Sequence, residues 1–292
     1  KQFEMSSQFS SKKHKFLRYY LGDVRDKERV KRAIEGVDYI IHAAALKQVN
    51  AAEKNPLEFI KTNILGAQNI IDTSLDANVK KVIALSSDKA ASPINLYGAT
   101  KLCSDKLFIA ANSYVGSRKL SFSVIRYGNV LGSRGSVLKV FLEKKKNSMP
   151  FGITDYKMTR FNLNIKQAVE STIWALTNSL GGEIVVPKIP SFKIIDLATA
   201  IDKNRKKIII GRGLGEKLHE ELISSSDSYT TYDIGKYYLI LPSQIPEQID
   251  KFKKKYKIFK KVEEDFSYTS KNNKDYLKVE EIKKEILKYD KI

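Results

Sequence analysis

VKKVIALSSDKAASPINLYGATK, residues 79–101, contains an apolar run, then a polar cluster, then the start of a helical pattern. The run at 79–87 is rich in β-branched residues and predicts a buried strand. The segment 97–115 carries apolar residues along one side, which predicts a helix. A strand that leads into a helix is the unit from which parallel α/β sheets are built, so this stretch indicates that class of fold.

The same alternation continues on both sides of this stretch. We expect strands at 37–45, 120–132, 182–189 and 206–211, and helices at 56–78, 164–179, 192–202, 216–223 and 277–290. The lysine-rich segment 250–261 is predicted to be either flexible or a solvated helix. The pattern therefore predicts a Rossmann-like, doubly wound parallel sheet, followed by a smaller C-terminal α/β lobe.

Length and composition exclude several classes of protein. The 292 residues are enough for a large core, and no run of about 18 apolar residues is present to cross a membrane. The polar N-terminus does not resemble a signal peptide. Cys103 is the only cysteine and the three histidines lie far apart, so we expect neither disulfides nor a metal site. These features predict a cytoplasmic protein that does not contact a membrane.

The net charge of +19 makes nucleic acid a partner to consider. Arginine supplies only 10 of the 52 basic residues, and no nucleic-acid-binding motif is present. Lysine is spread along the chain, which is typical of a solvated surface. We therefore expect no nucleic-acid partner, whereas a phosphate-bearing small substrate would benefit from the same positive field.

The segment KKIIIGRGLGEK, residues 206–217, resembles a dinucleotide-binding loop because it follows a predicted strand. The pattern G-x-G-x-x-G requires glycine at position 216, where this chain has Glu216. A carboxylate at that position would repel a pyrophosphate, so we do not assign this loop to a cofactor.

Three predicted strands end in small or polar residues: HAAA at 42–45, SSDK at 86–89 and RYGN at 126–129. In a doubly wound sheet such ends lie at one edge, where ligands bind. Tyr97 and Lys101 are four residues apart and share one face of the predicted helix. A nearby ammonium favours the phenolate and lowers the pKa of a tyrosine. The pair can then remove a proton from a hydroxyl while hydride leaves the carbon.

The chain resembles the extended short-chain dehydrogenase/reductase superfamily through Tyr97-x-x-x-Lys101, the serine-bearing strand end before it, and GDVRD at 22–26. Five blocks in one order are similar to the inverting UDP-N-acetylglucosamine 4,6-dehydratases, the C5-epimerising enzymes that begin pseudaminic acid synthesis. These blocks are HAAALKQV, SSDKAASPINLYGATKLCSDKLF, FSVIRYGNVLGSRGSV, ITDYKMTRF and GEKLHE. A capsule-type sister branch has methionine at the position of Tyr97, so the tyrosine favours the pseudaminic acid branch.

The resemblance implies an NADP-dependent dehydration, with NAD not excluded. Hydride leaves C4 of the sugar, the resulting ketone acidifies C5, water leaves from C6, hydride returns to C6 and C5 is reprotonated from the opposite face. By the family's motif Lys89 is the C5 base and Asp88 is the acid. We expect burial to lower the pKa of the lysine and to raise that of the carboxyl group, which brings both towards neutral pH.

Further contacts are carried over from the family's motifs. The implied cofactor-binding residues are Asp23, Val24, Ala43, Ala44, Ala45, Lys47, Tyr97, Lys101 and Val130. The implied substrate-binding residues are Lys47, Ser86, Ser87, Asn129, Arg134, Val137, Arg160, Arg212, Glu216 and Lys217. Arg212 is one residue away from the family's arginine, which puts its contact with the diphosphate in doubt.

The resemblance also implies an organisation of the chain. Residues 1–180 are expected to bind NADP, and residues 181–292 to form the nucleotide-sugar lobe, with 132–160 contributing to it. The family has about forty further residues upstream, including the glycine-rich phosphate loop, so we expect this sequence to lack the first βαβ element. A homo-oligomer, a UDP-sugar substrate and a role in flagellin glycosylation or polysaccharide synthesis are implied in the same way.

Two other interpretations stay open. A nucleotide-sugar 4-epimerase or a retaining dehydratase of the same superfamily would keep Tyr97 and Lys101, and the epimerase would not need Asp88 and Lys89. A non-catalytic nucleotide-binding or basic scaffold protein would need none of these acid–base residues, and it would bind polyanions with a steep salt dependence.

Overall fold

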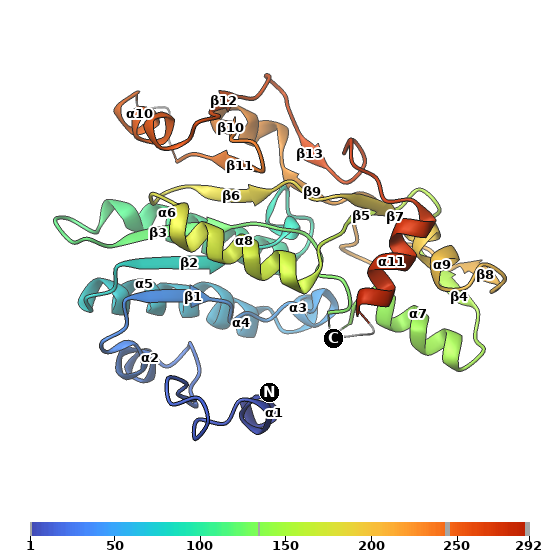
Figure 1. Cartoon of the computed structure of the whole chain (residues 1–292), viewed down its shortest axis with the longest axis horizontal. Helices are drawn as coiled ribbons and strands as arrows, with labels where there is room; N and C mark the ends of the chain where they lie inside the picture. The colour runs from blue at the N-terminus through green and yellow to red at the C-terminus, as the bar shows by residue number, and fades with distance from the viewer. Residues whose placement is uncertain (1, 134, 243–245, 290–292) are drawn as a thin grey trace.

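A mixed sheet of seven strands forms the centre of the computed structural model, which describes residues 2–133, 135–242 and 246–289 (Figure 1). In spatial order the strands are β1 (Tyr39–His42), β2 (Lys81–Leu85), β3 (Ser121–Ile125), β6 (Ile184–Pro187), β11 (Tyr237–Ile240), β10 (Thr231–Asp233) and β12 (Lys260–Lys261). The first four strands are mutually parallel, and the last three extend the sheet in antiparallel pairs. The sequence predicted the parallel part, whereas the antiparallel extension was not expected.

Helices cover both faces of this sheet, which confirms the predicted doubly wound class. The N-terminal and central helices are α1 (Gln2–Gln8), α2 (Lys27–Ile34), α3 (Val49–Lys54), α4 (Pro56–Phe59), α5 (Gly66–Asp76), α6 (Leu96–Ala110) and α8 (Ile165–Asn178). Successive side chains of β2 point to opposite faces of the sheet, as the pleat of a strand requires. Val82 and Ala84 pack in one core with Ile71 of α5, while Ile83 packs in another with Ala175 of α8.

A smaller part, on the right of Figure 1, has its own core. It is built from α7 (Val137–Lys146), β4 (Phe151–Ile153), β5 (Thr159–Phe161), β7 (Ser191–Lys193), α9 (Ile194–Ile201), β8 (Lys207–Ile209) and α11 (Val279–Tyr289). Phe141 and Phe151 stack there at 4.9 Å between ring centroids, so residues 132–160 do contribute to this part. A boundary at residue 180 does not separate the two parts, because β6, β11, β10 and β12 follow it in the chain and complete the large sheet.

The predicted helix at 216–223 is wrong. Residues 216–220 form a loop that leads into β9 (Glu221–Ile223), which pairs with β13 (Tyr268–Thr269). The backbone of this segment bonds to other parts of the chain, since Leu218 accepts from the Thr159 amide at 3.2 Å. Such tertiary hydrogen bonds replace those that a helix would make within itself.

Other boundaries differ in detail. The predicted helix at 56–78 is interrupted by a π-helical turn, η1 (Ile60–Leu65), between α4 and α5. Short 3-10 turns lie at η2 (Asp88–Ala90), η3 (Ala111–Ser113) and η4 (Ser225–Thr230). The lysine-rich segment lies partly in α10 (Pro246–Lys255). Among the described residues, no helix combines the length and the apolar character that a membrane span requires.

Candidate active site

The carboxyl ends of β1, β2 and β3 lie at one edge of the sheet, as parallel pairing dictates. A pocket of about 600 Å³ opens between this edge and the smaller part of the molecule. Its volume is within the range of small-molecule sites. The predicted site residues that line it are Lys47, Lys89, Asn129, Val130, Val137, Arg160, Glu216 and Lys217.

A tight turn places Asp88 and Lys89 at this edge. The Ser87 hydroxyl caps the turn by accepting from the Lys89 amide at 3.3 Å, and it donates to Asp88 Oδ1 at 2.7 Å. The turn is pressed against α6 at Gly98, where an added Cβ would lie 2.2 Å from the Lys89 carbonyl oxygen. Only glycine permits this approach, so the sequence Y-G-A-T-K fixes the turn as well as the tyrosine–lysine pair.

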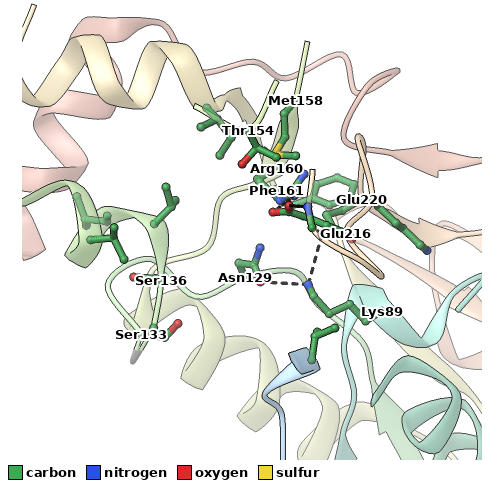
Figure 2. A pocket seen from close by; sticks show the side chains of 18 of the residues that line it. Lys89, Asn129, Ser133, Ser136, Thr154, Met158, Arg160, Phe161, Glu216 and Glu220 are labelled. Atoms are coloured by element: carbon green, nitrogen blue, oxygen red, sulfur yellow. Dashed lines mark hydrogen bonds and ion pairs between the residues drawn. The ribbon is translucent and has the colours of Figure 1, made fainter. Parts of the chain in front are cut away.

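Lys89 is held by two carboxylates. Its Nζ lies 3.1 Å from Asp88 Oδ1 and 3.4 Å from Glu220 Oε1, and it also donates to the Asn129 amide oxygen (Figure 2). Burial disfavours the ammonium, but Asp88 and Glu220 outweigh it and the pKa of Lys89 is raised. The expectation that burial would lower this pKa is therefore wrong, because the negative charges of Asp88 and Glu220 outweigh desolvation, and the sequence did not reveal the second of these carboxylates.

Tyr97 and Lys101 are both buried on α6. The Lys101 ammonium donates to the Leu85 carbonyl at 2.6 Å, and burial lowers its pKa. Burial raises the pKa of Tyr97, against its hydrogen bond with Ser87 and the positive charge of Lys89. The expectation that Lys101 would lower the pKa of Tyr97 is wrong in this state of the site, because desolvation of the phenolate dominates.

The stretch after β1 leaves space for a ligand at the edge of the sheet. Ala43, Ala44 and Ala45 are exposed and carry only methyl groups, which leaves room for a flat ligand on the backbone. The next residue, Leu46, is fixed on both backbone atoms by the buried Asn63 side chain, at 2.8 and 2.9 Å.

The implied adenine contacts lie at the turn before α2. Asp23 is exposed, and its carboxylate pairs with Arg25 at 2.7 Å. The neighbouring Val24 is half-buried, and its carbonyl accepts from the Asn69 side chain at 2.9 Å. The Asp23 carboxylate is therefore already engaged, and a ligand amine would share it with Arg25.

Of the predicted substrate residues, Arg160 and Lys217 line the pocket, whereas Arg212 does not. Arg160 is buried, and its guanidinium lies between Glu216 at 3.7 Å and Glu220 at 3.4 Å. Lys217 donates to the Ala91 carbonyl at 2.6 Å, and burial lowers its pKa. Arg212 is exposed and does not line the pocket, and Arg134 lies outside the described residues.

Ser86, a predicted sugar contact, is not among the residues that line the pocket. It is buried and donates to Asp105 Oδ2 at 2.7 Å, while Asp105 also meets Arg126 at 3.3 Å. This buried network supports the strand end from behind, and sequence reasoning missed both of its charged members. Hydrogen-bonding residues spaced 21 positions apart give no local pattern that would have revealed them.

Glu220 and Asn63 are the other site residues that the sequence did not indicate. Glu220 was assigned to a helix without a role, yet its side chain is buried in the pocket wall. Asn63 belongs to the π-helical turn, and such turns are frequent at functional sites. A polar residue inside the otherwise helical 56–78 pattern was the one available signal.

A parallel sheet with helices on both faces, and a tyrosine–lysine pair at its ligand-binding edge, define a Rossmann-fold protein of the short-chain dehydrogenase/reductase type. Solved structures agree with this class. Pen from Bacillus thuringiensis superposes with a TM-score of 0.85 at 35% identity over 98% of this chain and 86% of that chain. A dTDP-glucose 4,6-dehydratase, DesIV from Streptomyces venezuelae with NAD and TYD bound, shares the fold at a TM-score of 0.62 and 21% identity over 69% of each chain.

Residues 1–242 match the model of a family described as polysaccharide biosynthesis protein, and the chain belongs to this family. A UDP-N-acetylglucosamine 4,6-dehydratase (inverting) of Campylobacter jejuni subsp. jejuni is 51% identical over 97% of this chain and 85% of its own length. A UDP-glucose 4-epimerase of Rickettsia akari is 40% identical over 94% of this chain and 81% of its own length. Proteins similar to this chain therefore carry the names of a dehydratase and of an epimerase.

Proposed function

We propose that this protein is an inverting UDP-N-acetylglucosamine 4,6-dehydratase. The observation that carries the proposal is the Asp88–Lys89 pair, joined at 3.1 Å, in which Lys89 lines the pocket and the turn that carries both residues is held against α6 next to Tyr97. A hydride transfer at C4 alone needs an acid–base group for one hydroxyl. Removal of water between C5 and C6 needs a second base and a second acid, and this pair supplies both.

The first step uses Tyr97 and Lys101. A bound nicotinamide dinucleotide supplies the hydride acceptor at C4 and later the hydride for C6. Tyr97 takes the proton of the C4 hydroxyl, and Lys101, four residues further along α6, is held by the Leu85 carbonyl at 2.6 Å. Because burial raises the pKa of Tyr97, this residue is a phenol in the resting site, so it passes its own proton to its hydrogen-bond partner, the half-exposed Ser87, and from there to solvent as it takes the proton of the C4 hydroxyl.

The elimination uses the Asp88–Lys89 pair, and its proton starts on Lys89 because the pKa of that residue is raised. The proton crosses the existing hydrogen bond to Asp88, which leaves Lys89 as the neutral base. Lys89 then removes the C5 proton, which the C4 ketone has acidified, and Asp88 protonates the departing C6 hydroxyl so that it leaves as water. C6 then accepts hydride, and C5 takes a proton from solvent on the face opposite Lys89.

Further parts of the proposal rest on the sequence resemblance. They are NADP as the dinucleotide, assembly into a homo-oligomer, a cytoplasmic location, and a product that enters pseudaminic acid synthesis and flagellin glycosylation. It is also proposed that the cofactor binds at the large sheet and the nucleotide sugar against the smaller part, with Arg160, Glu216 and Lys217 facing the nucleotide. Arg212 is the weakest of the proposed substrate contacts because it lies away from the pocket.

A nucleotide-sugar 4-epimerase is the second candidate. The 40% identity to the Rickettsia akari epimerase supports it, as does the tyrosine–lysine pair, which an epimerase also uses. The Asp88–Lys89 pair favours the dehydratase.

The deciding experiment is incubation of the full-length protein with UDP-N-acetylglucosamine and NADP in deuterated water, followed by NMR of the product. We expect a 4-keto-6-deoxy sugar with deuterium at C5 and inverted C5 configuration. Retained configuration would assign the protein to the retaining dehydratases, and a C4 epimer would assign it to the epimerases. An unchanged sugar with binding intact would support a non-catalytic nucleotide-binding protein.

The variant Lys89→Ala separates the same candidates by mechanism. We expect water elimination to fall by about 10²- to 10⁴-fold, the usual loss for a general base, while reduction of bound NADP by the sugar persists. An epimerase would lose little activity. Lys106→Ala, an exposed change on α6, is the matched control.

A further inference from the structure

Glu220 is a buried carboxylate that the mechanism above does not use. It lies in the loop before β9 and is 3% exposed. Its Oε1 is 3.4 Å from Lys89 Nζ and 3.4 Å from Arg160 Nε (Figure 2). Its Oε2 is fully buried without a hydrogen-bond partner. Burial of a carboxylate is costly unless its charge is compensated, so this position needs a physical reason.

The Glu220 carboxylate contacts two cationic side chains of the pocket wall, Lys89 and Arg160, that have different proposed roles. Lys89 comes from the turn after β2, at the strand ends where proton transfer is proposed. Arg160 comes from β5 in the smaller part, and its guanidinium is proposed to face the diphosphate. Figure 2 shows the Lys89 side chain directed towards the group formed by Arg160, Glu216 and Glu220.

The charged groups around Lys89 come from every element packed against it. Asp88 of η2 and Glu220 favour its ammonium, whereas Arg160 of β5 disfavours it. Tyr97 of α6 and Lys217 of the 210–219 loop also lie within its electrostatic reach. Of the two carboxylates, only Glu220 also holds Arg160, because Asp88 Oδ1 is engaged by Ser87 and Lys89.

We propose that Glu220 is a positioning residue that holds Lys89 and Arg160 in one charge network, and thereby sets both the protonation of the C5 base and the place of the diphosphate-facing arginine. This inference rests on the proposed function. Glu220 itself touches no reacting atom. Its negative charge keeps the resting proton on Lys89, and its Oε1 fixes the direction of both cations.

The variant Glu220→Gln tests this because it keeps the shape and removes the charge. An opposite charge within a few ångströms shifts a pKa by about 1 to 3 units, so we expect the pKa of Lys89 to fall by about one unit or more. Loss of the proton that Lys89 shares with Asp88 ends activity at high pH, so the alkaline limb of the pH profile of kcat for dehydration should move to lower pH by the same amount. KM for the nucleotide sugar should rise, because Arg160 loses one of its two carboxylate partners.

Glu216→Gln is the matched control. It removes the other carboxylate next to Arg160, at 3.7 Å, and Glu216 has no contact with Lys89. We expect a higher KM and an alkaline limb in the wild-type position. Glu220→Asp keeps the charge but retracts it by one methylene, so the limb should stay near the wild-type position while kcat falls about tenfold. If Glu220→Gln does not fold, the aspartate variant decides: unchanged kcat and unchanged limb would overturn the proposal.

NMR of the lysine side chains gives a readout without turnover. The Lys89 Nζ resonance, assigned by comparison with Lys89→Ala, is followed against pH in the wild-type protein and in Glu220→Gln. A lower titration point in the variant supports the network even if the protein turns out not to dehydrate the sugar. The same titration point in both proteins would overturn the inference, and the proposed function would be unaffected.

Discussion

The contact between Gly98 and the Lys89 turn gives a sharp prediction. A methyl group at position 98 would lie 2.2 Å from the Lys89 carbonyl oxygen and 3.0 Å from Pro93 Cβ. Ordinary contact begins at 3.4 Å, so the turn and the helix must separate by about 1.2 Å in Gly98→Ala. The oxygen belongs to the backbone, so no side-chain rotation relieves the clash.

Two opposing energies then act on stability. Alanine within a helix is favoured over glycine by about 1 kcal/mol, while overpacking of a tight contact costs about 1–3 kcal/mol. The net change in the free energy of unfolding is therefore small, a loss of at most about 2 kcal/mol. Activity responds more strongly, because a displacement of about 1 Å in a catalytic group costs about 100-fold, which corresponds to about 2.7 kcal/mol in the barrier.

The assay is the rate of 4-keto sugar formation from UDP-N-acetylglucosamine, measured beside a thermal unfolding curve. We expect kcat/KM to fall about 100-fold with a Tm close to that of the wild-type protein. Lys106→Ala, on the exposed side of the same helix, should change neither quantity. A Gly98→Ala protein with wild-type kcat/KM and wild-type Tm would refute the reasoning, because it would mean that the turn has no fixed position against α6.

Two further predictions concern the strand end after β1. Asn63→Ala leaves the backbone N–H and C=O of Leu46 without their hydrogen-bond partner. We therefore expect the free energy of unfolding, measured in urea, to fall by about 1–3 kcal/mol and dinucleotide binding to weaken. Asn55→Ala, at an exposed position, is the control, and equal stability of the two variants would contradict this prediction. His42 is buried, and burial, reinforced by the charge of Lys101, lowers its pKa to about 4. The unfolded chain therefore binds a proton at this histidine at a higher pH than the folded chain does. The free energy of unfolding should be unaffected above about pH 6.5 and should decrease by about 3 kcal/mol as the pH falls towards 4. His42→Leu should flatten this part of the curve of Tm against pH, and parallel curves for the two proteins would rule the explanation out.

The parallel half of the fold was predictable because each element leaves a local signal. The β-branched run at 79–87 and the apolar stripe of 97–115 have the periods of a strand and a helix, and the structure places β2 and α6 there. The same holds for α8, whose capping box at Asn164 and Gln167 marks its start. Local periodicity is therefore sufficient where a segment buries one face against the sheet.

The antiparallel extension and the 216–223 segment were not predictable in this way. Strands β10 and β12 contain three and two residues, which is too short for a periodic pattern to be recognised. Residues 216–223 have a spacing of apolar residues that fits a helix, but their backbone finds partners in β5 and β13. Tertiary hydrogen bonds decided between two structures that the local sequence allows equally.

The catalytic turn was predictable, but its electrostatics were not. Asp88 and Lys89 are adjacent in sequence, so their pairing followed from the motif. Glu220 is 131 positions from Lys89, and only the fold brings it to 3.4 Å. Asp88 and Glu220 together reverse the expected direction of the Lys89 pKa shift, since burial alone would lower it.

That reversal changes how the proposed reaction has to begin. A lysine with a lowered pKa would be a base at once, whereas Lys89 first has to pass its proton to Asp88. The proton has a path, because Lys89 Nζ and Asp88 Oδ1 are 3.1 Å apart and joined by a hydrogen bond. The acid for the C6 hydroxyl is then produced by the same transfer that produces the base for C5. In the resting pair Lys89 carries the proton, so neither group is ready for the elimination. Transfer of that proton along the existing hydrogen bond gives the neutral lysine and the protonated carboxyl group that the elimination requires.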